Sequence, residues 1–239
     1  MPATLTVGLA QFAPIKGNIS ENLAQHVRLI EQAAKEQVRL LVFPELSLTG
    51  YEPELAKDLA LEYTSEPLCI LHDLAKKHSM TILAGTPLYV KNNKPELALA
   101  IISPDAPTRH YSKMHLYGIE NSFFSPGNQQ TMLTINSISI GLAVCADITH
   151  PEHVQHMVDD GADCYLASVL ISEQGYSAES KLLSEYARHH NIIVGMANFV
   201  GHSGPYSCAG NSTFWGKNGN ILTQASKPQP AVITTTISK

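Results

Sequence analysis

Residues 138–145 read ISIGLAVC, an apolar run that ends in a thiol. Aliphatic residues in a run of this length favour a buried strand. Pro151 follows shortly after and suits the first turn of a helix, which the pattern predicts over residues 151–158. A strand that leads into a helix is the repeating unit of α/β proteins, so this stretch favours the α/β class.

The same alternation extends on both sides of this stretch. Residues 40–43 read LLVF and are stopped by Pro44, which is typical of a strand buried on both faces. Strand–helix alternation followed by consecutive strands after Cys208 predicts a layered α/β domain with mixed sheets, and residues 216–219 suit a hairpin turn. Further strands are predicted at residues 4–12, 81–84, 98–102, 108–111, 164–167, 192–197, 212–215, 220–224 and 231–237, and further helices at residues 68–78 and 178–190.

A helix is also predicted shortly after the first strand. Asn18 or Ser20 can cap it, because both side chains accept hydrogen bonds from the free N–H groups of a first helical turn. Leu23, Val27 and Ile30 recur at helical spacing. We therefore expect these residues, with Ala34, to form the buried stripe of this helix.

The composition excludes several classes of protein. Apolar residues make up 44% of the 239 residues and charged residues 15%, which excludes a disordered chain. Lys and Arg number 16 against 21 Asp and Glu, so no positive excess is available to neutralise nucleic-acid phosphates. No apolar run is long enough to cross a bilayer. We expect a single domain over residues 1–239, with neither nucleic-acid nor membrane partners.

The cysteines are typical of a cytoplasmic protein. The four of them form no CxxC pair and no dense framework, and the first residues lack the basic and apolar regions of a signal peptide. The cysteines expected to be packing residues are Cys69, Cys164 and Cys208.

Three polar residues stand at the ends of predicted strands: Glu45, Lys113 and Cys145. Such positions are rigid and border clefts. Taken together, the groups suit nucleophilic catalysis. A cation favours the thiolate, a carboxylate can take the thiol proton and return it to a leaving amine, and the ammonium can stabilise an oxyanion. Taken singly, each has an ordinary explanation as a packing or solvated residue.

The contexts of these three residues share a resemblance. Residues 43–51, FPELSLTGY, resemble the glutamate motif of the nitrilase, or carbon–nitrogen hydrolase, superfamily. Residues 111–120, YSKMHLYGIE, followed by FSPG at 124–127, are similar to its lysine motif, and residues 141–147, GLAVCAD, to its nucleophile motif. The motifs occur in the family's order, and the resemblance covers nearly the whole chain.

The resemblance implies a four-layer α-β-β-α sandwich with two mixed β-sheets. It also implies hydrolysis of a non-peptide C–N bond through a thioester. By this resemblance Glu45 is the general base, Lys113 is the cation that stabilises the intermediate, and Cys145 is the nucleophile.

Three further residues acquire roles from the same resemblance. Glu120 matches the family's second glutamate, which positions substrate, and Tyr51 lies in the glutamate motif. The backbone N–H of Ala146 is expected to be an oxyanion donor. A small linear amide is the expected substrate, without a cofactor or a metal, and a homodimer is left open.

Other functions stay open at this point. N-carbamoyl hydrolases and true nitrilases use the same three groups. Thr149 and His150 stand where many members carry an arginine and an aromatic residue, so no substrate can be transferred from them. A non-catalytic binding protein with a degenerate enzyme fold is a third class, although the intact triad argues against it.

A cluster of histidines suggests a different chemical class. His150, His153 and His156 recur every three residues at a predicted helix start, and with other histidines they could bind zinc in a metallohydrolase. No HExxH pattern is present, and this spacing spreads ligands over a wide arc, so exposed helix histidines are the favoured interpretation. The other histidines considered are His189, His190 and His202.

Overall fold

The computed structural model describes residues 3–91, 93–226 and 228–239. Two mixed six-stranded sheets form its centre, in the orders β14-β1-β2-β3-β4-β5 and β13-β12-β9-β8-β7-β6. The first sheet contains β1 (Thr4–Gln11), β2 (Leu40–Val42), β3 (Thr81–Leu88), β4 (Glu96–Ile102), β5 (Arg109–Ser112) and β14 (Ala231–Ser238). The second contains β6 (Met132–Ile135), β7 (Ile138–Val144), β8 (Cys164–Ser168), β9 (Ile193–Ala197), β12 (Thr213–Trp215) and β13 (Ile221–Gln224).

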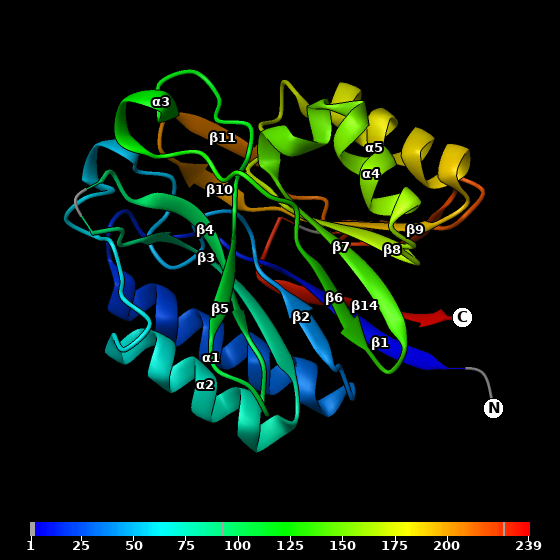
Figure 1. Ribbon diagram of the computed structural model, residues 1–239, viewed down its shortest axis with the longest axis horizontal. Helices are drawn as coiled ribbons and strands as arrows, with labels where there is room; N and C mark the ends of the chain where they lie inside the picture. Colours follow the sequence, from blue (N-terminus) through cyan, green and yellow to red (C-terminus); the bar gives the residue numbers. More distant parts are fainter. Residues whose placement is uncertain (1–2, 92, 227) are drawn as a thin grey trace.

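The four longer helices, α1, α2, α4 and α5, cover the outer faces of the two sheets, which produces the expected α-β-β-α layering. Figure 1 shows α1 and α2 on one side of the molecule and α4 and α5 on the other, with the strands between them. The helices are α1 (Ile19–Lys35), α2 (Glu66–His78), α3 (Glu120–Phe123), α4 (Pro151–Asp159) and α5 (Tyr176–His190). Two 3-10 turns, η1 (Pro53–Leu55) and η2 (Cys145–Thr149), and a hairpin of β10 (Val200–Ser203) and β11 (Tyr206–Ala209) complete the elements.

The largest apolar cluster joins the two sheets. Leu9 of β1, Leu142 of β7 and Phe214 of β12 belong to it, and each is fully buried. The run at β2 is buried throughout, as expected for a strand covered on both faces. Burying a side chain of this size contributes about 1.5–3 kcal/mol. The sheets therefore form a rigid base whose strand ends carry the candidate site.

The buried face of α1 differs from the predicted stripe. Asn18 caps the helix as expected, accepting from the backbone N–H of Glu21. Among its buried residues, however, are the polar Asn22 and His26. These side chains hydrogen-bond to the segment after β2, where Asn22 Nδ2 donates to the Leu48 carbonyl at 3.1 Å. Ile30 is buried as predicted, whereas the rest of the predicted stripe is only partly buried: Leu23, Val27 and Ala34. The buried face is centred on neighbouring positions because it includes the polar Asn22 and His26, which an apolar count leaves out.

Most predicted strands and helices are present, but some elements were not predicted. They include β6, α3 and the β10–β11 hairpin, all short and weakly patterned. The hairpin turn expected at residues 216–219 does connect the antiparallel β12 and β13. In the described part of the chain, no helix combines the length and apolarity that crossing a bilayer requires.

Candidate active site

Glu45 lies in the loop that follows β2, held closely against β3. A Cβ atom on Gly85 would lie 2.3 Å from the Leu46 nitrogen and 2.6 Å from the Pro44 carbonyl oxygen, so only glycine allows this approach. Ser47 Oγ accepts a hydrogen bond from the Gly85 N–H at 3.0 Å. The loop that carries Glu45 is therefore held closely against Gly85, and Glu45 itself is 1% exposed.

Lys113 directly follows β5 and is fully buried. Its Nζ donates to Glu45 Oε1 at 2.7 Å and to Glu120 Oε1 at 2.9 Å. Its backbone carbonyl accepts from the N–H of Gly127 at 2.8 Å, which holds the lysine loop in place. One ammonium therefore joins two buried carboxylates that come from different loops.

Glu120 is held more firmly than a loop glutamate would be. It begins α3 and is 1% exposed. The Tyr51 hydroxyl donates to its Oε1 at 2.9 Å, and the backbone N–H of Tyr117 donates to its Oε2 at 2.8 Å. Together with the bond from Lys113, these contacts fix both oxygens of the carboxylate.

Cys145 stands at the turn from β7 into η2, in a strained backbone conformation. Its φ of 42° lies in the left-handed region, which a residue with a Cβ seldom adopts. Such strain is common at functional sites, where the surrounding structure fixes it. The Sγ donates to the Leu170 carbonyl at 3.4 Å. The helix expected at residues 151–158 begins at Pro151 as predicted, and the 3-10 turn η2, which was not predicted, lies between the thiol and this helix.

The electrostatics keep the thiol protonated. Burial and the charge of Glu45 raise the pKa of the Cys145 thiol well above its usual value, and Lys113 offsets only part of this. Lys113 therefore acts in the direction that the sequence argument expected, but in the resting site burial and Glu45 outweigh it. Deprotonation requires a base, and Glu45 is a carboxylate close enough for its charge to act on the thiol.

Burial also shifts the two charged partners of the thiol. It raises the pKa of the Glu45 carboxyl to about 7, although Lys113 acts in the opposite direction. For Lys113 burial acts to lower the pKa, but the negative charges of Glu45, Cys145 and Glu120 outweigh it and hold the pKa above its usual value. Near neutral pH the lysine is a permanent cation and the glutamate can exchange a proton.

These side chains meet at a cavity of about 460 Å³. Its volume suits a small organic molecule. All the site residues expected from the sequence line it except Lys113, which lies behind Glu45 and Glu120. The lining residues are Glu45, Tyr51, Tyr117, Glu120, Cys145, Ala146, Thr149, Leu170, Ser172, Gln174, Gly175, Glu179 and Tyr206.

Asp147 is a buried residue of the site that the sequence analysis did not single out. Its Oδ1 accepts from the backbone N–H groups of Met114 and His115 at 3.2 and 3.0 Å. Its Oδ2 accepts from the Val144 N–H at 3.0 Å and the Tyr111 hydroxyl at 2.7 Å. Asp147 thereby ties the loop that carries Lys113 to the turn that carries Cys145. The only sign of this role in the sequence is that Asp147 lies two residues after Cys145.

Only part of the histidine prediction is confirmed, since His156 is exposed as expected and His153 is not. His153 is 1% exposed and bonds to the hydroxyls of Tyr111 and Tyr165 at 3.0 and 2.9 Å, so it is not an exposed helix histidine. His150 instead stacks on His115, with ring centroids 3.6 Å apart.

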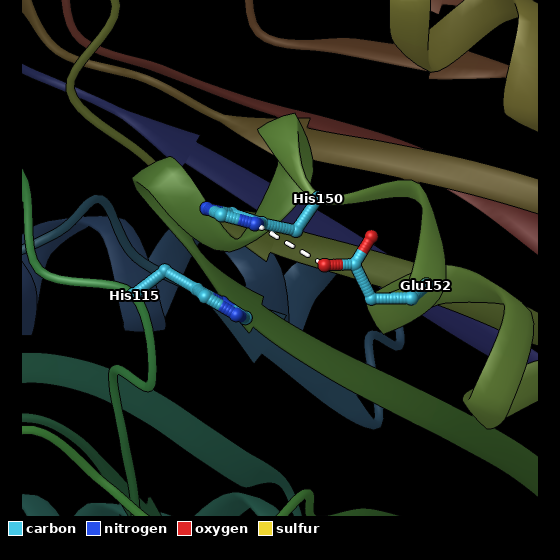
Figure 2. A group of neighbouring side chains, drawn as sticks. All are labelled: His115, His150 and Glu152. Atoms are coloured by element: carbon cyan, nitrogen blue, oxygen red, sulfur yellow. Dashed lines mark hydrogen bonds and ion pairs between the residues drawn. The ribbon is translucent and has the colours of Figure 1, made fainter.

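Figure 2 shows this histidine pair with Glu152, the three side chains pointing toward one another. One potential ligand atom from each lies within 4.8 Å of the other two, so this is the trio among the described residues that could hold a metal ion. None of the three lines the cavity. A metal held there would not face a molecule bound beside Cys145.

The other cysteines divide into two kinds. Cys164 and Cys208 are buried, in agreement with their expected packing role. Cys69 is exposed on α2, so the packing role expected for it is wrong. Burial raises the pKa of Cys208 to about 12, which makes this thiol a poor nucleophile.

Comparisons with known proteins identify the family and agree with the fold. The sequence profile of the carbon-nitrogen hydrolase family matches residues 6–239. The 2-oxoglutaramate amidase of Bacillus subtilis is 26% identical over 230 residues, which cover 95% of this chain and 88% of that protein. A glutamine-dependent NAD(+) synthetase of Thermotoga maritima is 26% identical over 242 residues, covering 96% of this chain and 41% of that protein, so this chain spans less than half of that relative's length. Among solved structures, the amidase from the nitrilase superfamily of Nesterenkonia AN1 superposes with a TM-score of 0.88 at 22% identity, covering 96% of this chain and 90% of that one.

Proposed function

This chain belongs to the carbon–nitrogen hydrolase family, and from that premise we propose that it hydrolyses a small linear amide through a thioester on Cys145. Glu45 is the general base of this proposal and Lys113 is the cation that stabilises the intermediate. The observation that carries it is the buried ammonium of Lys113, hydrogen-bonded to Glu45 and Glu120 beside a thiol at the wall of a cavity.

The first half of the reaction forms the thioester. Glu45 takes the proton from the Cys145 thiol as the sulfur attacks the carbonyl carbon of the amide. The oxygen of the tetrahedral intermediate becomes negative, and the ammonium of Lys113 stabilises it without losing its proton. When the C–N bond breaks, protonated Glu45 gives its proton to the departing nitrogen, which leaves as ammonia or an amine.

The second half of the reaction releases the acid. Glu45, again a carboxylate, takes a proton from a water molecule as its oxygen attacks the thioester carbon. The C–S bond breaks, and the proton held by Glu45 returns to the sulfur of Cys145. The carboxylic acid leaves, and the thiol and the glutamate are restored to their starting states.

The positions of three other residues support the same chemistry. Ala146 begins the turn after the thiol and lines the cavity, where its backbone N–H would be the second oxyanion donor. Glu120 and Tyr51 form a hydrogen-bonded pair on the cavity wall. In the proposal this pair orients Lys113 and the substrate amide, since small misplacements of reacting atoms are costly to rate.

The experiment that tests the proposal measures ammonia release from primary amides, nitriles and N-carbamoyl compounds, with intact-protein mass spectrometry of the trapped intermediate. We expect turnover of short amides and an acyl adduct on Cys145. The Cys145→Ala variant should form no adduct and show no turnover.

Two results would replace the proposal with an alternative. Turnover of nitriles or N-carbamoyl compounds with none of amides would assign a different substrate class to the same three groups. Turnover that persists in Cys145→Ala and disappears with a metal chelator would favour a metallohydrolase. If no compound of these classes is turned over, a non-catalytic binding protein becomes the better interpretation.

A further inference from the structure

The charges around the cavity are unbalanced. Three carboxylates line it, those of Glu45, Glu120 and Glu179. Lys113 supplies one positive charge behind the first two, and no lysine, arginine or histidine is among the described residues of the lining. The cavity therefore favours positive over negative ligands, because a bound anion would face carboxylates without a free cation of its own.

Glu179 is the carboxylate in this set that the catalytic proposal does not use. It lies in the first turn of α5 and lines the same cavity as Cys145. Its charge is close enough to raise the pKa of the Cys145 thiol. Glu45 and Glu120 are both hydrogen-bonded to Lys113, whereas none of the hydrogen bonds or ion pairs among the described residues involves the Glu179 carboxylate.

The surroundings of Glu179 keep its carboxylate in the cavity wall. Burial raises the pKa of this carboxyl to about 7, which means that it is partly removed from water without a compensating partner. Its Oε1 would lie 2.9 Å from a Cβ atom on Gly175, so the absence of a side chain at Gly175 leaves the space that the carboxylate occupies.

A purely structural role for Glu179 explains less. A glutamate in a first helical turn can stabilise the helix through its dipole, but an exposed glutamate does this without losing hydration. Glu179 is also not a cap of α5. The N–H groups of Gly175 and Tyr176 bond to Ser172 instead, at 3.2 Å to its Oγ and 3.0 Å to its carbonyl.

The cavity also contains two aromatic side chains. Tyr117 and Tyr206 line the cavity with Glu179, and aromatic faces attract cations. A carboxylate without a partner, in a partly enclosed cavity that also contains aromatic rings, suits an ammonium or guanidinium group. We propose that Glu179 forms a cation-binding subsite that selects small amides with a positively charged group remote from the amide carbon. This inference rests on the proposed amide hydrolysis and specifies its substrate class.

Three matched amides test the subsite at pH 8: 4-aminobutanamide, which is a cation, pentanamide, which has the same number of non-hydrogen atoms and no charge, and succinamate, an anion of similar length. For the wild-type protein we expect kcat/KM of the cation to exceed that of pentanamide by about tenfold or more, as for other charge-assisted contacts, and succinamate to be the poorest substrate. In Glu179→Gln the cation-to-neutral ratio should fall by about fivefold or more, because the charge is removed while the shape is kept.

Glu185→Gln provides the matched control. Glu185 lies on the same helix, α5, is half exposed, and is outside the cavity lining. The same chemical change there should leave the cation-to-neutral ratio at its wild-type value. Because each ratio compares two substrates of one variant, it is unaffected by changes in the fraction of folded protein.

The outcomes separate this inference from the proposed function. If pentanamide is hydrolysed and the cation has no advantage, or if Glu179→Gln keeps the wild-type ratio, the subsite is refuted while the amidase proposal stands. If no amide is hydrolysed, calorimetric binding of 4-aminobutanamide and pentanamide decides the subsite alone. Tighter binding of the cation that is lost in Glu179→Gln supports it, and equal binding of the two amides refutes it.

Discussion

In the Asp147→Asn variant, a carboxylate oxygen that accepts hydrogen bonds becomes an amide group that donates them. Asp147 is fully buried, and all five of its contacts come from donors. Oδ1 receives the Met114 N–H, the His115 N–H and His115 Nδ1, and Oδ2 receives the Tyr111 hydroxyl and the Val144 N–H. If the asparagine oxygen takes the place of Oδ1, the asparagine NH2 group takes the place of Oδ2. The Val144 N–H then faces another donor and loses its acceptor.

The expected loss of stability follows from these contacts. An unpaired buried N–H costs about 1–3 kcal/mol, and each of the three bonds kept at Oδ1 weakens by about 1 kcal/mol when the acceptor loses its charge. The Tyr111 hydroxyl can accept from the new amide, so its contact is kept. The sum is a loss of about 4–6 kcal/mol, which for a chain of this size lowers Tm by about 8–24 °C.

Activity should fall together with stability, because the bonds to Met114 and His115 fix the loop that carries Lys113. A misplacement of about 1 Å can cost about a hundredfold in rate, so we expect kcat to fall by about 10–100-fold at a temperature where the variant is folded. Thermal melts and steady-state kinetics measure both effects. Asp159→Asn, an exposed change on α4, is the control and should melt like the wild type. A variant at Asp147 with wild-type Tm and kcat would refute the reasoning.

Three further predictions concern the rest of the site. Burial raises the pKa of Glu45 to about 7, and a general base must be ionised to act, so kcat/KM should rise as the pH increases through about 7. A pH profile of kcat/KM that is flat down to pH 5 would contradict this prediction. Gly85→Ala should lower Tm and kcat together, since the new Cβ would meet the Leu46 nitrogen at 2.3 Å; an active, stable variant would show that the Glu45 loop can move without cost. Glu120→Gln should remain folded but have a lower kcat, because Lys113 keeps a hydrogen-bond partner there that no longer carries a charge. A thermal melt measured beside the kinetics distinguishes a loss of activity from unfolding, and wild-type kcat and KM would contradict the prediction.

Local patterns were sufficient for the layered class and for the candidate residues. The apolar run of β7 and the Asn18 cap of α1 act within a few residues, so both can be recognised along the chain. The three motifs led to Glu45, Lys113 and Cys145 for the same reason, since each is a short segment at a strand end. Short elements such as β6 have too few residues to produce a clear period.

The tertiary structure decided what depends on residues far apart in the sequence. Lys113 and Glu45 are 68 positions apart, and their bond exists only because β2 and β5 belong to one sheet and end beside the same cavity. Burial and the charge of Glu45 there outweighed the expected effect of the lysine on the thiol, because removing an ionised group from water can cost more than a single nearby charge returns. The roles of Asp147 and Glu179 were hidden for the same reason. Hydration and hydrogen bonding are set by the three-dimensional surroundings of a group, and periodicity along the chain does not describe them.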